Sequence, residues 1–395
     1  MKSVKGGVTA ARGFLATGMH CGIKYKNKDL ALIYSQNPCV ACGVFTQNKV
    51  QAAPLKLTKK HLANHRAQAI VTNSGNANCC TGKIGLSDAQ QMAKSIAKEL
   101  GIAKENVLVA STGIIGKRLP IGKIVSKASF LVKKLNANGS SNAAKAILTT
   151  DTKLKQSAVK VKLGNKIVTI GGIAKGAGMI APNMATMLAF LTTDAAIASK
   201  ELRKTLKRAV DASFNSITVE GDTSTNDMVL ILANGLAANA KLSRRNLGLF
   251  QEALEHVCLS LAKMIVKDAE GGTKFVAIEV KEANNALQAK KVALKVANSP
   301  LVKTAIYGEN PNWGRIAACV GAADGAITQG NLSIFLGSEK VMHHGAAIAT
   351  NSTKLGTIFK KSEIQIKICL GLGKAKATVY TSDLTHKYIT INAEY

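Results

Sequence analysis

The chain has 395 residues, with 53 Lys and Arg against 23 Asp and Glu, a formal net charge of +30. Hydrophobic residues make up 47% and charged residues 19%, so the composition excludes a disordered chain and predicts two or three folded domains. The basic residues are dispersed, without aromatic platforms or a zinc-finger pattern beside them, so we expect no nucleic-acid partner.

The opening residues contain no apolar core of the length that a signal peptide needs, and no later run approaches a membrane helix of roughly 20 residues. We therefore predict a cytoplasmic protein without a membrane partner. Eight cysteines do not make a disulfide framework. Cys39 and Cys42 form a CxxC without a second pair, and Cys79 and Cys80 are adjacent. We interpret these cysteines as buried thiols and expect no metal.

Three helices are predicted by apolar residues at helical spacing. Residues 86–101 begin with a capping box at Ser87 and end before Gly101, which favours a helix end. Residues 200–214 and 249–268 repeat the helical period.

Strand patterns lie between these helices. Residues 158–170 alternate around Gly164–Asn165 as a hairpin does, residues 274–280 alternate as one strand, and residues 364–380 indicate another glycine-bridged pair. By composition, residues 135–144 are the best candidate for a linker. Helices that alternate with hairpin-containing sheets favour an α/β or α+β sandwich over a purely parallel sheet.

Three patterns that suggest nucleotide or metal binding are rejected. The GxGxxA at residues 176–181 is followed by Pro182 and an apolar run, where a dinucleotide site needs a helix. The GxxGK at residues 113–117 is two residues shorter than a phosphate-binding loop. The two histidines of HLANH, residues 61–65, lack a third ligand, and we interpret them as an exposed helix face.

Thr186 stands between a glycine-rich turn and the apolar run MLAFL. A strand threonine usually reflects only the fit of its branched Cβ to a pleated surface. The upstream glycines, however, permit backbone conformations that bring a hydroxyl onto the preceding carbonyl, that of Ala185. If that peptide bond breaks, Thr186 gains an α-amino group with a pKa of about 7.7 to 8, which suits proton transfer from its own hydroxyl. Threonine with its own amine is an established nucleophile for acyl transfer.

The stretch GGIAKGAGMIAPNMATMLAFLTTDA, residues 171–195, closely resembles the self-processing segment of the ornithine acetyltransferase family, also called the bifunctional glutamate N-acetyltransferases of arginine biosynthesis. The resemblance spans essentially the whole chain through further motifs in the family's order: CGVFTQNKV, TNSGNAN, STGIIG, LTTDT, ITVEGDTSTND, KDAEGGTK, GENPNWGRI and INAEY. It implies a layered α/β sandwich of the N-terminal-nucleophile-like type, shared by aminopeptidases and ornithine acetyltransferases. Such a fold has mixed sheets and a smaller C-terminal α+β domain, here at about 280–395.

The resemblance also implies a reaction. Cleavage between Ala185 and Thr186 gives an alpha chain, 1–185, and a beta chain, 186–395, assembled as α2β2. Thr186 takes acetyl from N2-acetylornithine, releases ornithine and passes the acetyl group to glutamate, giving N-acetylglutamate in a ping-pong cycle. No cofactor is implied. Members restricted to this recycling and members that also use acetyl-CoA carry the same motifs, so acetyl-CoA stays open as a co-substrate.

By the same resemblance, Thr112 through its hydroxyl and Gly113 through its amide form the oxyanion hole. Substrate binding maps by motif onto Thr149, Lys175, Thr186, Glu270 and Asn392. Lys175 suits a carboxylate and Glu270 an amino group, whereas Thr149 and Asn392 offer neutral hydrogen bonds. Without the motifs, Lys175 and Glu270 would be interpreted as solvated surface charges.

Two features depart from the family's pattern. Relatives continue past AEY with one or two hydroxyl residues, one of which touches substrate, so we expect that contact to be missing or replaced here. The net charge of +30 also exceeds what the family leads us to expect. Two alternatives stay open: an N-terminal-nucleophile aminopeptidase or amidase, with water in place of glutamate, and a nucleic-acid-binding protein with a defunct catalytic core.

Overall fold

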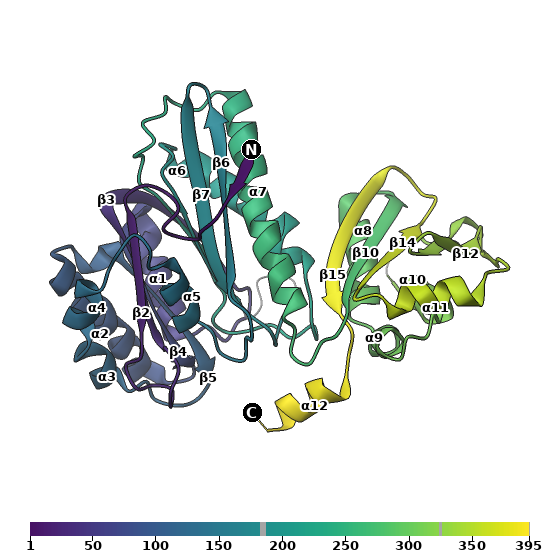
Figure 1. Cartoon of the computed structure of the whole chain (residues 1–395), viewed down its shortest axis with the longest axis horizontal. Helices are drawn as coiled ribbons and strands as arrows, with labels where there is room; N and C mark the ends of the chain where they lie inside the picture. The colour runs from purple at the N-terminus through teal and green to yellow at the C-terminus, as the bar shows by residue number, and fades with distance from the viewer. Residues whose placement is uncertain (182–186, 324–325, 395) are drawn as a thin grey trace. The chain divides into compact units, whose positions relative to one another are not determined.

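The computed structural model describes residues 1–181, 187–323 and 326–394, drawn as ribbons in Figure 1. These residues form two compact units. The first unit comprises Met1–Met179, residues 187–215 and Asp222–Ile265, and the second comprises residues 180–181, Ser216–Gly221 and 266–394. Within the described ranges, no helix combines the length and the apolar character needed to cross a membrane.

The first unit is built on one large mixed sheet. Its strands are β1 (Lys2–Val4), β2 (Phe14–Met19), β3 (Leu30–Phe45), β4 (Arg66–Asn76), β5 (Val107–Ile114), β6 (Lys155–Leu163), β7 (Lys166–Lys175), β8 (Leu188–Thr193) and β9 (Met228–Ala233). They run in the order β1-β6-β7-β8-β9-β3-β4-β5, and β2 pairs with β3. The pairs β4–β5 and β8–β9 are parallel, whereas β3–β4 and β7–β8 are antiparallel. The predicted mixed sheet is therefore confirmed.

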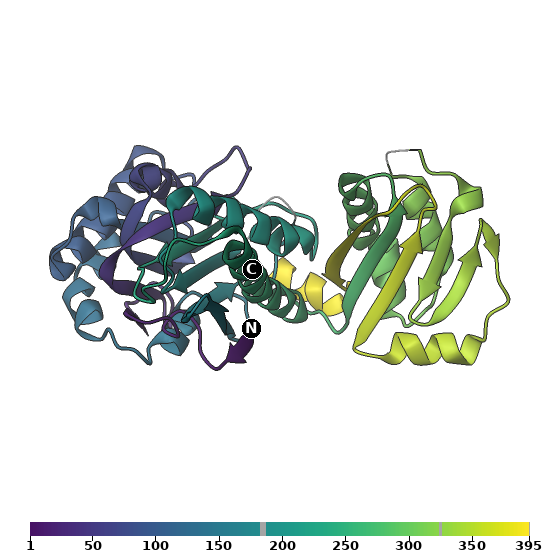
Figure 2. The ribbon, with the colours of Figure 1, turned by 90° about the horizontal axis from the view of Figure 1, so that it is seen from above.

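Helices cover both faces of this sheet (Figure 1 and Figure 2). They are α1 (Ala53–His61), α2 (Gly82–Leu100), α3 (Ile121–Val125), α4 (Ala128–Lys133), α5 (Ser140–Ala146), α6 (Ser199–Ala212) and α7 (Arg244–Lys267, within this unit as far as Ile265). Neighbouring strand residues face opposite cores: Val71 packs in one cluster with Met92 of α2, and Ile70 in another with Ala143 of α5. This arrangement is the layered α/β fold that was predicted.

The hairpin predicted around Gly164–Asn165 is confirmed, since Leu163 of β6 pairs with Lys166 of β7. The start of the helix predicted at 86–101 was wrong. Helix α2 begins at Gly82, so Ser87 lies inside it and caps nothing. The amide of Asn78, which donates to the Gly85 carbonyl at 2.8 Å, holds this earlier first turn in place.

The linker prediction for residues 135–144 was also wrong. Helix α5 begins within this stretch, and Ala143 and Ala144 are fully buried in the first unit. A Cβ on Gly139 would lie 1.7 Å from the carbonyl oxygen of Ala16, so the backbones pack in direct contact there. The small residues serve close packing rather than flexibility.

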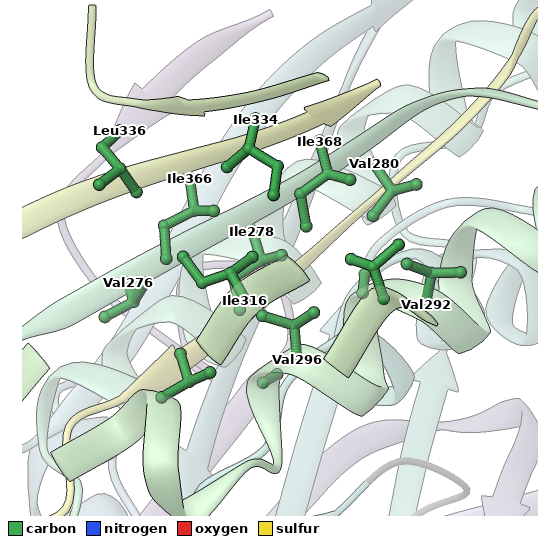
Figure 3. Close-up of a cluster of buried hydrophobic side chains, with 14 of the residues drawn as sticks. Val276, Ile278, Val280, Val292, Val296, Ile316, Ile334, Leu336, Ile366 and Ile368 are labelled. Carbon is green, nitrogen blue, oxygen red and sulfur yellow. The ribbon is translucent and has the colours of Figure 1, made fainter. Parts of the chain in front are cut away.

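The second unit has its own sheet in the order β13-β12-β11-β14-β10-β15. Its elements are β10 (Phe275–Ala283), α8 (Ala286–Ala297), α9 (Pro300–Tyr307), α10 (Trp313–Gly321), β11 (Ser333–Leu336), β12 (Glu339–His343), β13 (Ala346–Ala347), α11 (Ser352–Lys360), β14 (Glu363–Cys369), β15 (Ala375–Ser382) and α12 (His386–Ala393). Figure 3 shows its core, where Ile278 and Ile366 from the sheet face Val296 of α8 and Ile316 of α10. This unit is the smaller α+β part of the predicted fold, and its main segment begins at residue 266.

The hairpin predicted at residues 364–380 was wrong. Both of its strands form, but β10 lies between them, parallel to β14 and antiparallel to β15. The glycine-containing connection crosses the end of β10, where the N–H groups of Leu372 and Gly373 donate to the Glu282 carbonyl. The sequence pattern of two apolar strands joined by a glycine-containing segment is compatible with this crossover as well as with a hairpin.

The histidine interpretation fails for His61, which is 8% exposed and has its Nδ1 2.8 Å from the Val107 carbonyl oxygen. Cys39, Cys42 and Cys79 are buried as predicted, whereas Cys80 is exposed. Among the residues that the structure describes, no group of three His, Cys, Asp or Glu side chains is placed to hold a metal ion.

Candidate active site

The parallel strands β4 and β5 end side by side at one edge of the first unit's sheet. The register pairs Gly75 with Gly113 and Ser74 with Thr112, whose side chain is nearly buried. Gly113 has φ of +132°, and a Cβ there would lie 2.4 Å from the carbonyl carbon of Gly75. Only glycine fits this position, so the two predicted oxyanion residues stand on a tightly fixed pair of strand ends.

One loop connects this edge to the start of β8. The amide Nδ2 of Asn226 donates to the carbonyl oxygens of Ser111 at 2.8 Å and Ala77 at 2.6 Å. The neighbouring carboxylate of Asp227 accepts from the N–H of Met187 at 2.9 Å. Two consecutive side chains therefore hold two segments of the site. Asp227 holds Met187, and Asn226 holds the end of β5 just before Thr112.

The predicted cleavage junction, Ala185 and Thr186, lies outside the described residues. The described chain resumes at Met187 and enters β8, between β7 and β9 in the sheet. Lys175, the last residue of β7, pairs with Leu188. Residues 176–181 form no helix, which agrees with the rejection of a dinucleotide motif there.

One buried carboxylate, that of Asp151, gathers the groups around Thr149 and Lys175. It accepts hydrogen bonds from the backbone N–H groups of Thr149 at 3.0 Å and Gly176 at 2.6 Å. Lys155 Nζ donates to its Oδ1 at 2.7 Å, and Lys175 Nζ lies 3.9 Å from its Oδ2. Thr149 and Lys175, predicted from separate motifs, are thus organised by the same side chain.

Two ammonium groups share this carboxylate. Burial alone would raise the pKa of Asp151, but Lys175, Lys155 and the Gly176 N–H outweigh it and lower that pKa from 3.8 to about 2. Asp151 therefore stays ionised at neutral pH, and the two lysine side chains beside it favour a substrate carboxylate nearby. Lys175 is only 2% exposed, so it is not a solvated surface charge.

The Asp151 cluster and the glycine pair lie in the same region, joined by a third lysine. Lys24 Nζ donates to the carbonyl oxygen of Leu148, the residue before Thr149. The stem of the same side chain packs on Gly75, because a Cβ there would lie 3.0 Å from Lys24 Cγ. The first unit therefore brings together four of the predicted residues: Thr112, Gly113, Thr149 and Lys175.

The second unit brings together two more of the predicted residues. Asn392 Nδ2, on α12, donates to Glu270 Oε2 at 2.9 Å and to the Tyr388 carbonyl at 3.0 Å. Asn392 is exposed and Glu270 half-buried. These two contacts use both donors of the amide, so the pair offers carboxylate and amide oxygens, which accept hydrogen bonds from an amino group.

The loop that carries Glu270 is tied to the start of α12. Gly271 has φ of +67°, and its carbonyl accepts from Thr385 Oγ1, the N-cap of α12, at 2.8 Å. The Asp383 carboxylate accepts from the N–H groups of Thr273 at 2.8 Å and Lys274 at 2.9 Å. The spacing between Glu270 and Asn392 is therefore set by a hydrogen-bonded frame on both sides.

A profile of the ArgJ family matches residues 15–395. The chain belongs to the ArgJ family. Relatives named "Arginine biosynthesis bifunctional protein ArgJ" are 44% identical in Bacillus licheniformis, covering 100% of this chain and 98% of that protein, and 46% identical in Gloeobacter violaceus, covering 99% and 98%. These matches confirm the resemblance on which the site residues were predicted.

Two solved structures of ArgJ proteins also match over part of the chain. The arginine biosynthesis bifunctional protein argJ of Bacillus halodurans is 45% identical, covers 46% of this chain and 97% of that one, and has a TM-score of 0.45. An ornithine acetyltransferase of Mycobacterium tuberculosis, complexed with ornithine, is 40% identical, covers 45% and 94%, and has a TM-score of 0.42.

The ArgJ motifs contain polar residues whose role the sequence did not indicate. Asp151 lies in LTTDT, and Asn226 and Asp227 close ITVEGDTSTND, yet only their hydrogen bonds show that they organise the predicted site. A buried carboxylate is rare unless it is paired, so an Asp within a motif beside several lysines is the signal that would have found Asp151.

Proposed function

We propose that this chain transfers an acetyl group from N2-acetylornithine to glutamate in arginine biosynthesis, through an acetyl ester on Thr186. Its membership of the ArgJ family and the names of its relatives support this activity. The structural observation that carries the proposal is the Asn226–Asp227 loop, because it holds Met187, the residue after Thr186, and the strand end that leads to Thr112.

In the proposed cycle the Thr186 hydroxyl attacks the acetyl carbonyl, and its α-amino group takes the hydroxyl proton. The negative charge on the tetrahedral oxygen is stabilised by the Thr112 hydroxyl and the Gly113 N–H. The intermediate collapses to the ester, and ornithine leaves with the proton returned by the amine. The amino group of glutamate then attacks the ester, and N-acetylglutamate leaves as the threonine hydroxyl is restored.

The two charge patterns support the amino-acid substrates. The two lysine side chains beside Asp151 favour an α-carboxylate, and the oxygens of Glu270 and Asn392 favour an ammonium group. Both features occur together on ornithine. Glutamate supplies the carboxylate in the second half of the cycle.

The finer parts of the proposal concern maturation and assembly. The precursor cuts itself between Ala185 and Thr186 into residues 1–185 and 186–395, which assemble as α2β2 in the cytoplasm. No cofactor takes part, and nucleic acid is not a partner. Because the relatives are named bifunctional, the proposal includes acetyl-CoA as a second acetyl donor to glutamate.

Intact mass spectrometry of the purified protein and of Thr186→Ala tests the maturation. We expect two chains for the wild type, the second beginning at Thr186, and one chain of 41.4 kDa for the variant. A wild type that remains one chain contradicts the free-amine mechanism.

Ornithine release from N2-acetylornithine, with and without glutamate, tests the activity. We expect glutamate to accelerate release and N-acetylglutamate to accumulate in equal amount. Equal release without glutamate would instead identify water as the acceptor, as in an N-terminal-nucleophile amidase. Glutamate supplied with acetyl-CoA alone tests the second donor in the same assay.

A further inference from the structure

Lys24 lies at the predicted site but in none of the motifs that identified it. Its loop, residues 20–29 between β2 and β3, wraps around the fully buried carboxylate of Asp29. Asp29 accepts hydrogen bonds from the backbone N–H groups of Cys21 at 2.6 Å, Ile23 at 2.7 Å and Lys24 at 2.9 Å. One carboxylate therefore fixes the backbone from which the Lys24 side chain projects.

The side chain is held on two sides. Its stem packs on Gly75, the partner of Gly113 in the sheet, and its Nζ donates to the carbonyl oxygens of Leu148 and, at 3.1 Å, of Lys28. An ammonium group carries three N–H donors, so these two acceptors among the described residues leave one donor for a ligand.

A comparison with Lys303 shows what a structural lysine looks like in this protein. Lys303, in the second unit, is 3% exposed and donates to Thr381 Oγ1 and to the carbonyl and hydroxyl oxygens of Ser382. Its contacts thus occupy three donors with protein oxygens. Lys24 is only half-buried and keeps a donor, which a purely structural role does not require.

Lys175 is the cation that the sequence assigns to the substrate carboxylate, yet it is buried beside Asp151. The charges of Lys175 and Asp151 both act on the ammonium group of Lys24. The Lys24 side chain is also more exposed than the side chains of those two residues. We propose, on the basis of the function above, that Lys24 is a further substrate-binding residue, whose ammonium group receives the α-carboxylate of the amino-acid substrate between Thr149 and the Gly75–Gly113 pair.

Titration distinguishes this role from simple packing. Burial, the largest influence, lowers the pKa of Lys24 from 10.5 to about 8; the charge of Lys175 lowers it further, while Asp29 and Asp151 raise it. Lys24 therefore changes from mostly cationic to mostly neutral around pH 8. Substrate affinity that depends on its charge falls as the pH rises through 8.

Binding of ornithine to the mature wild-type enzyme, measured by calorimetry between pH 6.5 and 9.5, tests the proposal without chemistry. We expect Lys24→Met to weaken ornithine binding roughly tenfold at pH 7, as for the loss of one charge-assisted hydrogen bond. Because the α-amino groups of ornithine and of Thr186 also titrate in this range, this variant should lose less affinity above pH 8 than the wild type rather than none. Lys26→Met, on the same loop but exposed, is the matched control and should bind like the wild type.

Lys24→Arg keeps the charge at every pH of the experiment and separates the charge from folding. We expect it to lose less affinity than the wild type between pH 7 and 9.5, and we expect its thermal unfolding and its chain masses to match the wild type. The proposal is overturned if Lys24→Met binds ornithine as the wild type does, or if Lys24→Arg loses affinity through pH 8 as the wild type does. A wild type that neither binds ornithine nor transfers acetyl contradicts the proposed function instead.

Discussion

The two units hold their predicted substrate residues in opposite ways. In the first unit Thr149 and Lys175 are organised by Asp151, whose side chain is 0% exposed and which also pairs with Lys155. In the second unit Glu270 and Asn392 meet at the surface through one hydrogen bond. Buried charges are costly to leave unpaired, whereas exposed pairs contribute little to stability. The first unit therefore holds its residues around a buried charge, and the second holds an exposed pair of acceptors.

The largest expected effect comes from removing the carboxylate at the centre of the cluster. Asp151→Asn removes the buried carboxylate that Lys155 and Lys175 share, so we expect the free energy of unfolding to fall by about 3–5 kcal/mol in urea denaturation. Asp211→Asn is the matched control, because Asp211 pairs with Lys207 at the same i, i+4 spacing on an exposed helix face. The control should lose less than about 1 kcal/mol. Equal losses would remove the contrast between the units.

The next effect tests the glycine pair beside the cluster. Gly113→Ala forces a Cβ against the Gly75 backbone and displaces the N–H that the proposed oxyanion hole requires. We expect kcat for acetyl transfer to fall by about 10²–10³, the cost of losing one oxyanion donor. Gly116→Ala is the control, because its φ is also positive, +83°, but nothing lies within 4 Å of its added Cβ. If both variants lose the same activity, backbone strain rather than the oxyanion geometry explains the loss.

Acid should weaken the cluster by a smaller amount. The folded-state pKa of Asp151 lies below its ordinary value, about 2 against 3.8. Its contribution to stability is therefore complete above the unfolded pKa and is lost as the pH falls through 3.8 toward 2. The contribution is about 2 kcal/mol, and urea denaturation of the wild type between pH 6 and 2.5 measures it. Asp151→Asn should remove this part of the pH dependence. If the pH dependence of the unfolding free energy is the same in Asp151→Asn as in the wild type, a group other than Asp151 is responsible for the loss of stability in acid.

These contrasts also show what the sequence could and could not predict. Local patterns identified the β6–β7 hairpin and the α2 segment, because each signal is contiguous in the chain. Motif order led to the prediction of Thr149 and Lys175, which the structure places beside the same carboxylate. The pairing of β14 and β15 with β10 was missed, since a connecting segment rich in glycine does not reveal which strand lies between its ends.

The role of Lys24 was missed for a related reason. Nothing in its own loop distinguishes it from the exposed lysines nearby, and only the contacts with Leu148 and Gly75, far away in the chain, place it at the site. Whether a charged residue is buried depends on the tertiary fold. From the sequence alone, a lysine such as Lys24 is therefore interpreted as a solvated surface residue. Part of the positive charge that exceeded expectation lies in this cluster.

The smallest effect on stability is expected at Asn392. A variant at this residue also tests the contrast between the exposed pair of the second unit and the buried cluster of the first. Asn392→Ala removes the donor that holds Glu270 and one acceptor for an amino group, so we expect ornithine to bind about fivefold more weakly, as for the loss of one ordinary hydrogen bond. Because the residue is exposed, the free energy of unfolding should change by less than about 0.5 kcal/mol.

Thr390→Ala is the control for Asn392→Ala, since Thr390 lies on the same helix and its hydroxyl donates to the His386 carbonyl of that helix. Calorimetry with ornithine and urea denaturation should distinguish the two variants. Asn392→Ala should lose ornithine affinity without losing stability, whereas Asp151→Asn should lose stability first. If Asn392→Ala destabilises the protein as Asp151→Asn does, the second unit also depends on its pair for folding. The exposed pair would then contribute to stability as the buried cluster does, and the contrast between the units would be lost.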